Sequence, residues 1–264
     1  MDLSHAILFG IIQGVTEFLP ISSSAHLRII RNICGIFENE PAFEIFLNAG
    51  SFLAIVFFYH QLIWKLLRGS WDLLTVCRSE DRDFFITIAV SSVPVIVIFG
   101  IAEIVFSISI NSMLIMSIAM IVFSVVLWLC DRNAQQMPGP VSRKHSILVG
   151  IAQILSFIPG VSRLGSCLSM MRYLGYSRRE SFRYAMLMSL VPVCGAITLK
   201  LLKVFCGKIF INDWNAVFVG GLFAFVSGLI TLHFMDSFLK THQLLPIIIY
   251  RIIFGFCIAI NCLF

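Results

Sequence analysis

"QGVTEFLPISSSAH", residues 13–26, places a glutamine, a glutamate, three consecutive serines and a histidine in an otherwise apolar N-terminal region. Gln13 and Glu17 are four residues apart, so a helix would carry both on one face. Pro20 ends that helix, and Ser22 can cap a second one. The stretch therefore predicts two short helices that meet at a polar break.

The rest of the chain has the composition of an integral membrane protein. Of its 264 residues, 59% are hydrophobic and 12% are charged, whereas soluble domains average about 45–50% and 25%. The basic residues are scattered, which argues against nucleic acid as a partner. The eight cysteines contain no C-x-x-C pair, so neither a zinc site nor a disulfide framework is supported. Six apolar segments reach the length of about 20 residues that crosses a bilayer, namely 44–66, 84–106, 111–130, 182–203, 214–235 and 244–263.

A second broken segment resembles the first. "GIIQGVTEFLPISSS" (10–24) and "GIAQILSFIPGVSR" (150–163) share Gly-Ile, Gln, Phe, Pro and Ser in the same order. In both broken segments, 3–34 and 145–175, each half is too short to cross a membrane. Such halves on either side of a Pro or Gly break suggest a re-entrant hairpin. Chance similarity between short apolar strings is the alternative interpretation.

Each predicted hairpin is followed by three spans, and an odd number of spans inverts the second half relative to the first. We therefore expect one all-α integral membrane domain over 1–264, with six transmembrane helices and two re-entrant helical hairpins. Residues 1–132 would form the first inverted repeat and 133–264 the second. Broken helices at matching positions of inverted repeats indicate a site near the middle of the membrane.

The loop charges predict an orientation. Twelve of the 19 lysines and arginines fall on the side that holds the loop 61–83, and five fall on the other side. Arg163 and Arg251 lie within membrane segments. By the positive-inside rule the first side is cytoplasmic. Both termini would then face outward, with the first hairpin entering from outside and the second from the cytoplasm.

The two breaks are rich in groups that bind phosphate. A helix N-terminus offers free N–H groups and a positive dipole end, which favour an anion. Ser22 and Ser162 would each precede such a helix, Gly160 allows close backbone approach, and the planar fork of Arg163 suits phosphate oxygens. Glu17 and His26 add a carboxylate and an imidazole, which suit cleavage of a bound phosphate. Ionisable groups inside a membrane are costly and are functional candidates by default, so we interpret the breaks as one site for a lipid phosphate or diphosphate.

"QGVTEFLPISSSAH" and "PGVSR" (159–163) resemble the two motifs of the undecaprenyl-diphosphate phosphatase family, also called bacitracin-resistance proteins. The likeness extends to "NAGSFLAIV" (48–56) and "YRIIFG" (250–255), and so covers nearly the whole chain. It implies hydrolysis of a C55 polyprenyl diphosphate to the monophosphate that serves as lipid carrier in peptidoglycan synthesis. It also implies a bacterial plasma (inner) membrane location, with the site open to the periplasm or exterior. A homodimer is among the oligomeric states left open.

The resemblance also implies roles for residues. Glu17 would bind a divalent cation, Mg²⁺ or Ca²⁺, or act as a base, and Ser23 would be the nucleophile. His26 would activate Ser23 or else act on water directly, while Arg163 would bind phosphate or pair with Glu17. Arg251 is expected to be structural, paired with a carbonyl or carboxylate. The further substrate-binding candidates are Gln13, Ser22, Ser24, Asn48, Gly160 and Ser162, although Ser22 and Ser24 are equally explained as helix-packing residues.

The chain departs from the family pattern at three places. Gln13 stands where a second glutamate is common, so a site with two carboxylates is not available. Leu164 and Cys167 replace a usual serine and threonine, which puts substrate affinity in doubt. Two other functions stay open: a transporter or flippase of polyprenyl phosphate, since inverted repeats are also typical of transporters, and a catalytically silent relative.

Overall fold

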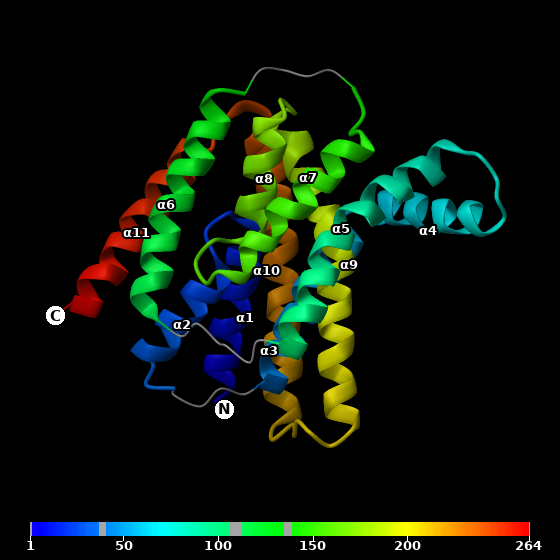
Figure 1. The fold of residues 1–264 in the computed structure, drawn as a ribbon. Helices are drawn as coiled ribbons and strands as arrows, with labels where there is room; N and C mark the ends of the chain where they lie inside the picture. The colour runs from blue at the N-terminus through cyan, green and yellow to red at the C-terminus, as the bar shows by residue number, and fades with distance from the viewer. Residues whose placement is uncertain (1, 37–40, 106–111, 135–138, 264) are drawn as a thin grey trace.

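The opening stretch forms a pair of helices in the computed structural model, which describes residues 2–36, 41–105, 112–134 and 139–263. α1 (Leu3–Phe18) ends two residues before Pro20, and α2 (Ser23–Ile33) begins three residues after it. The two helices contact each other, and α2 runs back toward the end of the molecule where the N-terminus lies (Figure 1). The predicted break at Pro20 is confirmed.

The second broken segment forms a matching pair. α7 (Arg143–Ile154) continues into a short 3-10 turn, η1 (Leu155–Phe157), and α8 (Arg163–Tyr173) follows the Pro159–Gly160 break. In Figure 1 this pair lies at the opposite end of the molecule from the N-terminus. The residues that precede α2 and α8 share an uncommon backbone conformation, with φ of 73° at Ser22 and 65° at Ser162.

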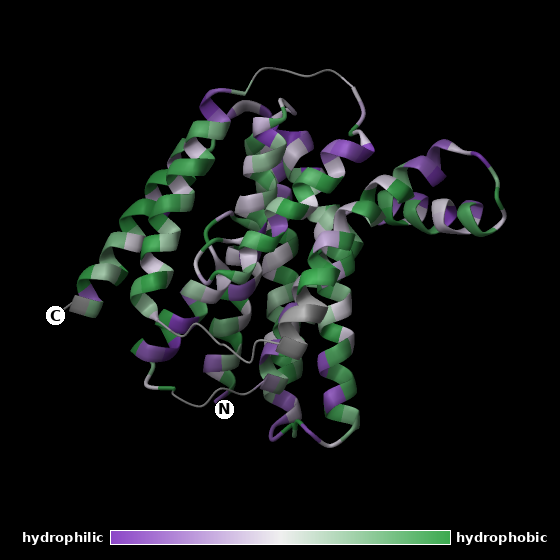
Figure 2. Cartoon of the chain, viewed as in Figure 1, coloured by the Kyte–Doolittle hydropathy of each residue, from purple (hydrophilic) through white to green (hydrophobic). Residues whose placement is uncertain are grey.

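Longer helices surround the two pairs, and the described residues form helices and turns without a β-strand, as the all-α prediction requires. Five helices are long and apolar enough to cross a membrane, and Figure 2 shows hydrophobic residues along α6 and α11. The five are α3 (Pro41–Phe58), α6 (Met113–Arg132), α9 (Arg178–Phe205), α10 (Trp214–Thr241) and α11 (Leu245–Leu263).

The remaining predicted span, 84–106, lies in α5 (Glu80–Val105) except for its last residue. The side chains of residues 99–105 and all of residue 106 lie outside the described part of the chain. α5 therefore has the expected helical conformation, whereas its role as a sixth span stays a prediction.

The predicted span at 44–66 is confirmed as a span by α3, but its predicted C-terminal end is wrong. α3 ends at Phe58, and a separate helix, α4 (His60–Leu74), begins after Tyr59. α4 contacts α5 and projects sideways from the bundle (Figure 1). Neither glycine nor proline marks this turn, and apolar residues continue past it into α4, so hydropathy alone does not detect it.

Small residues hold α1 against α10. A methyl group added at Gly10 would overlap the backbone of Gly220, and one added at Gly14 would overlap the backbone of Ala224 and Gly228. Such close backbone approach is the usual way in which membrane helices associate tightly. Because α10 is a long apolar helix, this contact fixes the position of α1 and of the polar residues at its end.

Candidate active site

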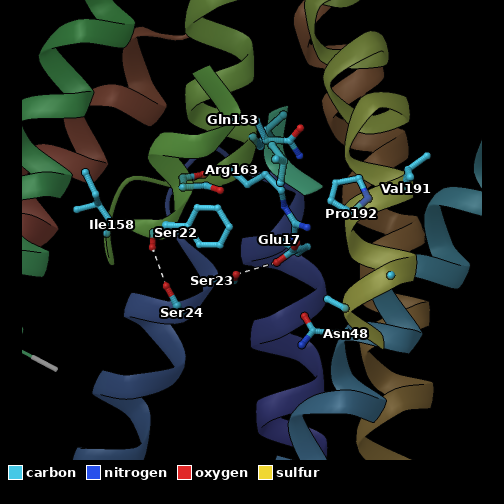
Figure 3. A pocket seen from close by; sticks show the side chains of 18 of the residues that line it. Glu17, Ser22, Ser23, Ser24, Asn48, Gln153, Ile158, Arg163, Val191 and Pro192 are labelled. Carbon is cyan, nitrogen blue, oxygen red and sulfur yellow. Dashed lines mark hydrogen bonds and ion pairs between the residues drawn. The ribbon is translucent and has the colours of Figure 1, made fainter. Parts of the chain in front are cut away.

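Glu17 lies at the centre of a hydrogen-bond network that joins the two breaks. Its Oε1 forms an ion pair with the guanidinium of Arg163, the first residue of α8. Its Oε2 accepts a hydrogen bond from the Oγ of Ser23 at 2.7 Å and another from the Nε2 of Gln13 at 3.3 Å. Figure 3 shows Glu17, Ser23 and Arg163 around one cavity. Four predicted site residues, drawn from both breaks, are thus in contact.

Gln13 positions the carboxylate. Its Nε2 donates to Glu17 and also to the Oδ1 of Asn48 on α3, both at 3.3 Å. Asn48 is held in turn by a hydrogen bond from its Nδ2 to the carbonyl of Glu44, at 2.8 Å. The amide at position 13 therefore links Glu17 to α3, a connection that a second carboxylate could not make by donating.

The three serines have different environments. Ser23 is the first residue of α2, and its hydroxyl is directed at Glu17. Ser22 occupies the cap position of α2, but its side chain makes no capping hydrogen bond. The hydroxyl of Ser22 lies 3.2 Å from that of Ser24 instead. The predicted capping by Ser22 is therefore wrong, because its hydroxyl pairs with that of Ser24 and accepts no backbone N–H of α2.

His26 is buried, and its ring is held away from Ser23. Its Nδ1 lies 2.8 Å from the carbonyl oxygen of Ser22, and its Nε2 lies 2.8 Å from the hydroxyl of Tyr250. The ring also stacks on Phe254, with centroids 4.2 Å apart. A carbonyl oxygen only accepts, so Nδ1 carries the proton. Both ring nitrogens are thus engaged, and no described hydrogen bond joins His26 to Ser23.

The second break supplies the cation and a helix N-terminus. The Oγ of Ser162 accepts a hydrogen bond from the backbone N–H of Gly165 at 3.2 Å, which confirms the predicted cap of α8. Gly160 has a φ of 95°, which favours glycine, and its backbone packs against that of Met116. These features place Arg163 at the start of α8, facing the end of α1.

Arg251 of α11 ties the two breaks together. It is fully buried and donates to the carbonyl oxygens of Pro20 at 2.9 Å, Gly160 at 2.8 Å and Val161 at 2.7 Å. The predicted structural role, pairing with carbonyls, is confirmed. One guanidinium fixes the end of the first hairpin to the end of the second.

Replacing Arg251 with methionine is expected to destabilise the protein and abolish phosphate release from a lipid diphosphate. Three buried carbonyls would lose their donor, at about 1–3 kcal/mol for each unsatisfied group. We expect the melting temperature in detergent to fall by about 5–10 °C. Arg143→Met, which breaks an exposed ion pair with Asp83, is the control and should leave both readouts unchanged. An Arg251→Met protein as stable as the wild type would contradict the assigned role.

Two cavities meet at Ser23, Ser24 and Asn48. The first, about 480 Å³, has polar walls at Glu17, Ser23 and Arg163 and apolar walls from α5 and α9, among them Val95 and Val191. Figure 3 shows Val191 and Pro192 across this cavity from the polar residues. A cavity of this size and mixed lining suits a ligand with one charged end and one apolar end.

The second cavity, about 460 Å³, is more polar. Arg28, Arg31 and Glu44 line it, together with Gln13. Ser23, Ser24 and Asn48 line both cavities and therefore lie between them. Sequence reasoning predicted the two serines and the asparagine but did not assign the arginines, which it used only as topology signals.

The two unusual residues of the second motif have different surroundings. Leu164 lines the first cavity, so the hydroxyl of the serine usual at this position is absent from the cavity wall. Cys167 is fully buried in the main hydrophobic core with Phe182 and Met186, and it lines neither cavity. The expected weakening of phosphate binding therefore finds support at position 164 only.

The expectation of a divalent cation rests on Glu17. Among the described residues, no group of three His, Cys, Asp or Glu side chains could hold a metal ion. The Ser23 hydroxyl donates to this carboxylate, and so does the Nε2 of Gln13, which also donates to the Oδ1 of Asn48. Mg²⁺ commonly uses one or two carboxylates together with substrate phosphates. The donor set thus fits a cation that binds with a diphosphate.

The fold and cavities define a multi-pass helical membrane protein with a polar site beside a cavity that has apolar walls. A family model described as "Bacitracin resistance protein BacA" matches residues 6–257, and the chain belongs to this family. It is 35% identical to a protein of Nocardioides sp., 31% to one of Saccharophagus degradans and 32% to one of Campylobacter curvus. These alignments cover 97% of this chain and 94%, 96% and 97% of the relatives, each of which is named undecaprenyl-diphosphatase.

Proposed function

We propose that this chain hydrolyses undecaprenyl diphosphate to undecaprenyl phosphate and inorganic phosphate. The reaction recycles the lipid carrier for peptidoglycan synthesis, and with it cell-wall formation and cell shape, and confers bacitracin resistance. The observation that carries the proposal is the contact of Ser23 and Arg163 with the same carboxylate, Glu17, beside a cavity with apolar walls. Family membership and the names of the relatives support it.

In this proposal the diphosphate binds between the two breaks. Arg163 and the free N–H groups at the starts of α2 and α8 hold the terminal phosphate. The phosphate binds the guanidinium of Arg163 in place of Glu17, so the Arg163–Glu17 ion pair breaks. Gln13 and Asn48 keep the freed carboxylate in place. Ser22, Ser24, Gly160 and Ser162 complete the polar lining as substrate-binding residues.

Ser23 then attacks the terminal phosphorus. Its proton passes to Glu17, with which it already shares a 2.7 Å hydrogen bond. The bond between the terminal phosphorus and the bridging oxygen breaks, and that oxygen leaves with its electron pair on undecaprenyl phosphate. Glu17 releases this proton to water. A second water molecule then attacks the phosphoserine, its P–Oγ bond breaks, and one hydrogen of that water returns to the Oγ of Ser23 as inorganic phosphate leaves. In the competing route water attacks directly and Ser23 only binds the phosphate. The bonds of His26 to Ser22 and Tyr250 support a positioning role for its ring.

We further propose that Mg²⁺ or Ca²⁺ binds through Glu17 and the diphosphate oxygens. Such a cation neutralises charge on the diphosphate. Phosphate release should fall to background with excess EDTA and return on addition of Mg²⁺. The measurement is phosphate release by the purified chain from farnesyl diphosphate, with the melting temperature recorded in EDTA to exclude unfolding. Full activity in EDTA would contradict the metal requirement.

The proposed membrane arrangement has six spans, α5 included, with the hairpins α1–α2 and α7–α8 re-entering from opposite faces as parts of two inverted repeats. The chain would lie in the bacterial inner membrane with the site open to the periplasm or exterior.

Native cysteines can test this orientation. Cys206 follows α9, Cys77 follows α4, and both are exposed. In intact cells an impermeant maleimide should label a chain that retains only Cys206 and spare one that retains only Cys77; the reverse would overturn the orientation.

A second candidate function is transport or flipping of polyprenyl phosphate. Helical pairs at opposite ends of the bundle (Figure 1) are the observation that favours it, because such pairs are also typical of transporters. The purified chain separates the two functions. Hydrolysis predicts phosphate release from farnesyl diphosphate in detergent, whereas transport without hydrolysis predicts lipid exchange in liposomes and no release. Light scattering of the same sample tests whether the chain forms a homodimer, an oligomeric state that the sequence leaves open.

A further inference from the structure

Gln153 is a buried amide without a hydrogen-bond partner. It lies in the last turn of α7 and is fully buried, at 0% exposure. Among the residues that the structure describes, neither its Oε1 nor its Nε2 has a partner. An unsatisfied amide in an apolar interior costs about 1–3 kcal/mol on the scale of protein mutations, so an apolar side chain of this size would give a more stable fold. The amide is explained if a ligand completes its hydrogen bonds.

The matching residue of the first hairpin differs in this respect. Gln13 stands at the same place in "GIIQ" as Gln153 does in "GIAQ", and its amide is bonded to Glu17 and Asn48. The two glutamines therefore have separate tasks. Gln13 orients side chains of the protein, whereas the amide of Gln153 can form hydrogen bonds with a ligand in the cavity.

The position of Gln153 indicates which part of the substrate it meets. It lines the first cavity, with the apolar walls from α5 and α9, and it is absent from the lining of the polar second cavity. Figure 3 shows Gln153 above Arg163 at this first cavity. Ser23, Ser24 and Asn48 lie between the two cavities. A phosphate that remains on an apolar chain belongs in the first cavity, and a free phosphate that leaves into water belongs in the second.

We propose that Gln153 binds the phosphate that remains on the polyprenyl chain. Its Nε2–H donates to an oxygen of that phosphate, and its Oε1 accepts a hydrogen bond from a water molecule of the phosphate's hydration shell. Gln153 is then a substrate- and product-binding residue on the lipid side of the bond that breaks. The inference rests on the proposed function, because it names the part of the same substrate that this amide recognises.

The test uses Gln153→Met, which keeps the size of the side chain and removes the amide. The KM for farnesyl diphosphate should rise about tenfold, as loss of one hydrogen bond to a charged group predicts, while kcat changes less than threefold. Inhibition by farnesyl phosphate should weaken about tenfold, whereas inhibition by inorganic phosphate should not change. The melting temperature of the ligand-free variant should equal or exceed that of the wild type, since an unsatisfied amide has been removed.

Ser92→Ala is the matched control. Ser92 is buried in α5 with no partner for its Oγ among the described residues, and it does not line the first cavity. This variant should also keep or raise the melting temperature, but with unchanged KM and unchanged inhibition by farnesyl phosphate. It separates the removal of any unsatisfied polar atom from the removal of a ligand-binding one.

Three results would overturn the inference. The first is an unchanged KM in Gln153→Met, and the second is weakened inhibition by inorganic phosphate instead of farnesyl phosphate. The third is a lower melting temperature, which would assign the amide a structural role. A wild-type chain that releases no phosphate would contradict the proposed function instead. In that case calorimetric titration of wild type and variant with farnesyl phosphate still tests Gln153, and equal affinities would reject it.

Discussion

Arg163→Ala should lower phosphate release from farnesyl diphosphate about 10³-fold. The guanidinium supplies the fixed positive charge beside Glu17, and removal of an arginine that stabilises a transferring phosphoryl group costs about 10³- to 10⁵-fold in other enzymes. Here a second effect adds to it, because Glu17 would be left without its ion-pair partner and would repel the diphosphate. Steady-state kinetics of the purified variant measure the change.

Two comparisons make this result specific. Arg163→Lys retains the charge but loses the planar fork, so its activity should lie between those of the wild type and Arg163→Ala. Arg179→Ala removes an exposed arginine that forms an ion pair with Asp236 and should leave activity unchanged. If Arg163→Ala retained more than about a tenth of wild-type activity, Arg163 would be only the structural partner of Glu17.

Ser23→Ala should have an effect of similar size, again about 10³-fold, because it removes the nucleophile. The protein should still bind farnesyl diphosphate, since Arg163 and the helix N-termini remain. Acid quenching of a reaction with substrate labelled in the terminal phosphate should leave label on the wild-type protein and none on Ser23→Ala. This experiment decides between a phosphoserine and direct attack by water.

Ser117→Ala is the control for loss of a buried serine. Its hydroxyl bonds only to the backbone of Leu114 among the hydrogen bonds described for it, and activity should not change. His26→Gln is the informative comparison, because it tests whether the histidine or Glu17 takes the proton of Ser23. With Glu17 as the base, His26→Gln should retain more activity than Ser23→Ala. Equal losses in the two variants would favour His26.

The two helical breaks were predictable because their causes are local. Pro20 and Pro159–Gly160 cannot continue a helix, and the flanking segments are too short to span a bilayer. The similarity of the two segments also led to the expectation that Glu17 and Arg163 lie close together, although they are 146 residues apart. A repeated motif thus predicted a contact that spacing alone could not.

Other features depend on tertiary packing and leave no local pattern. The turn at Tyr59 has no glycine or proline beside it, so a hydropathy profile merges α3 with α4. The orientation of His26 is decided by Tyr250 and Phe254, more than 220 residues later. Ser22 was expected to cap α2 because serine usually does, but its hydroxyl pairs with that of Ser24 instead.

Arg251 has a mechanical consequence for the site. Because one side chain from α11 holds carbonyls of both hairpins, the hairpins cannot move apart unless some of its buried hydrogen bonds break. Alternating access by rocking one half against the other would require that rupture in every cycle. Hydrolysis requires no such movement if the lipid approaches sideways between α5 and α9, whose residues line the first cavity. The two hairpins then stay fixed around the headgroup, and the movement in each cycle is that of the lipid as it enters and leaves.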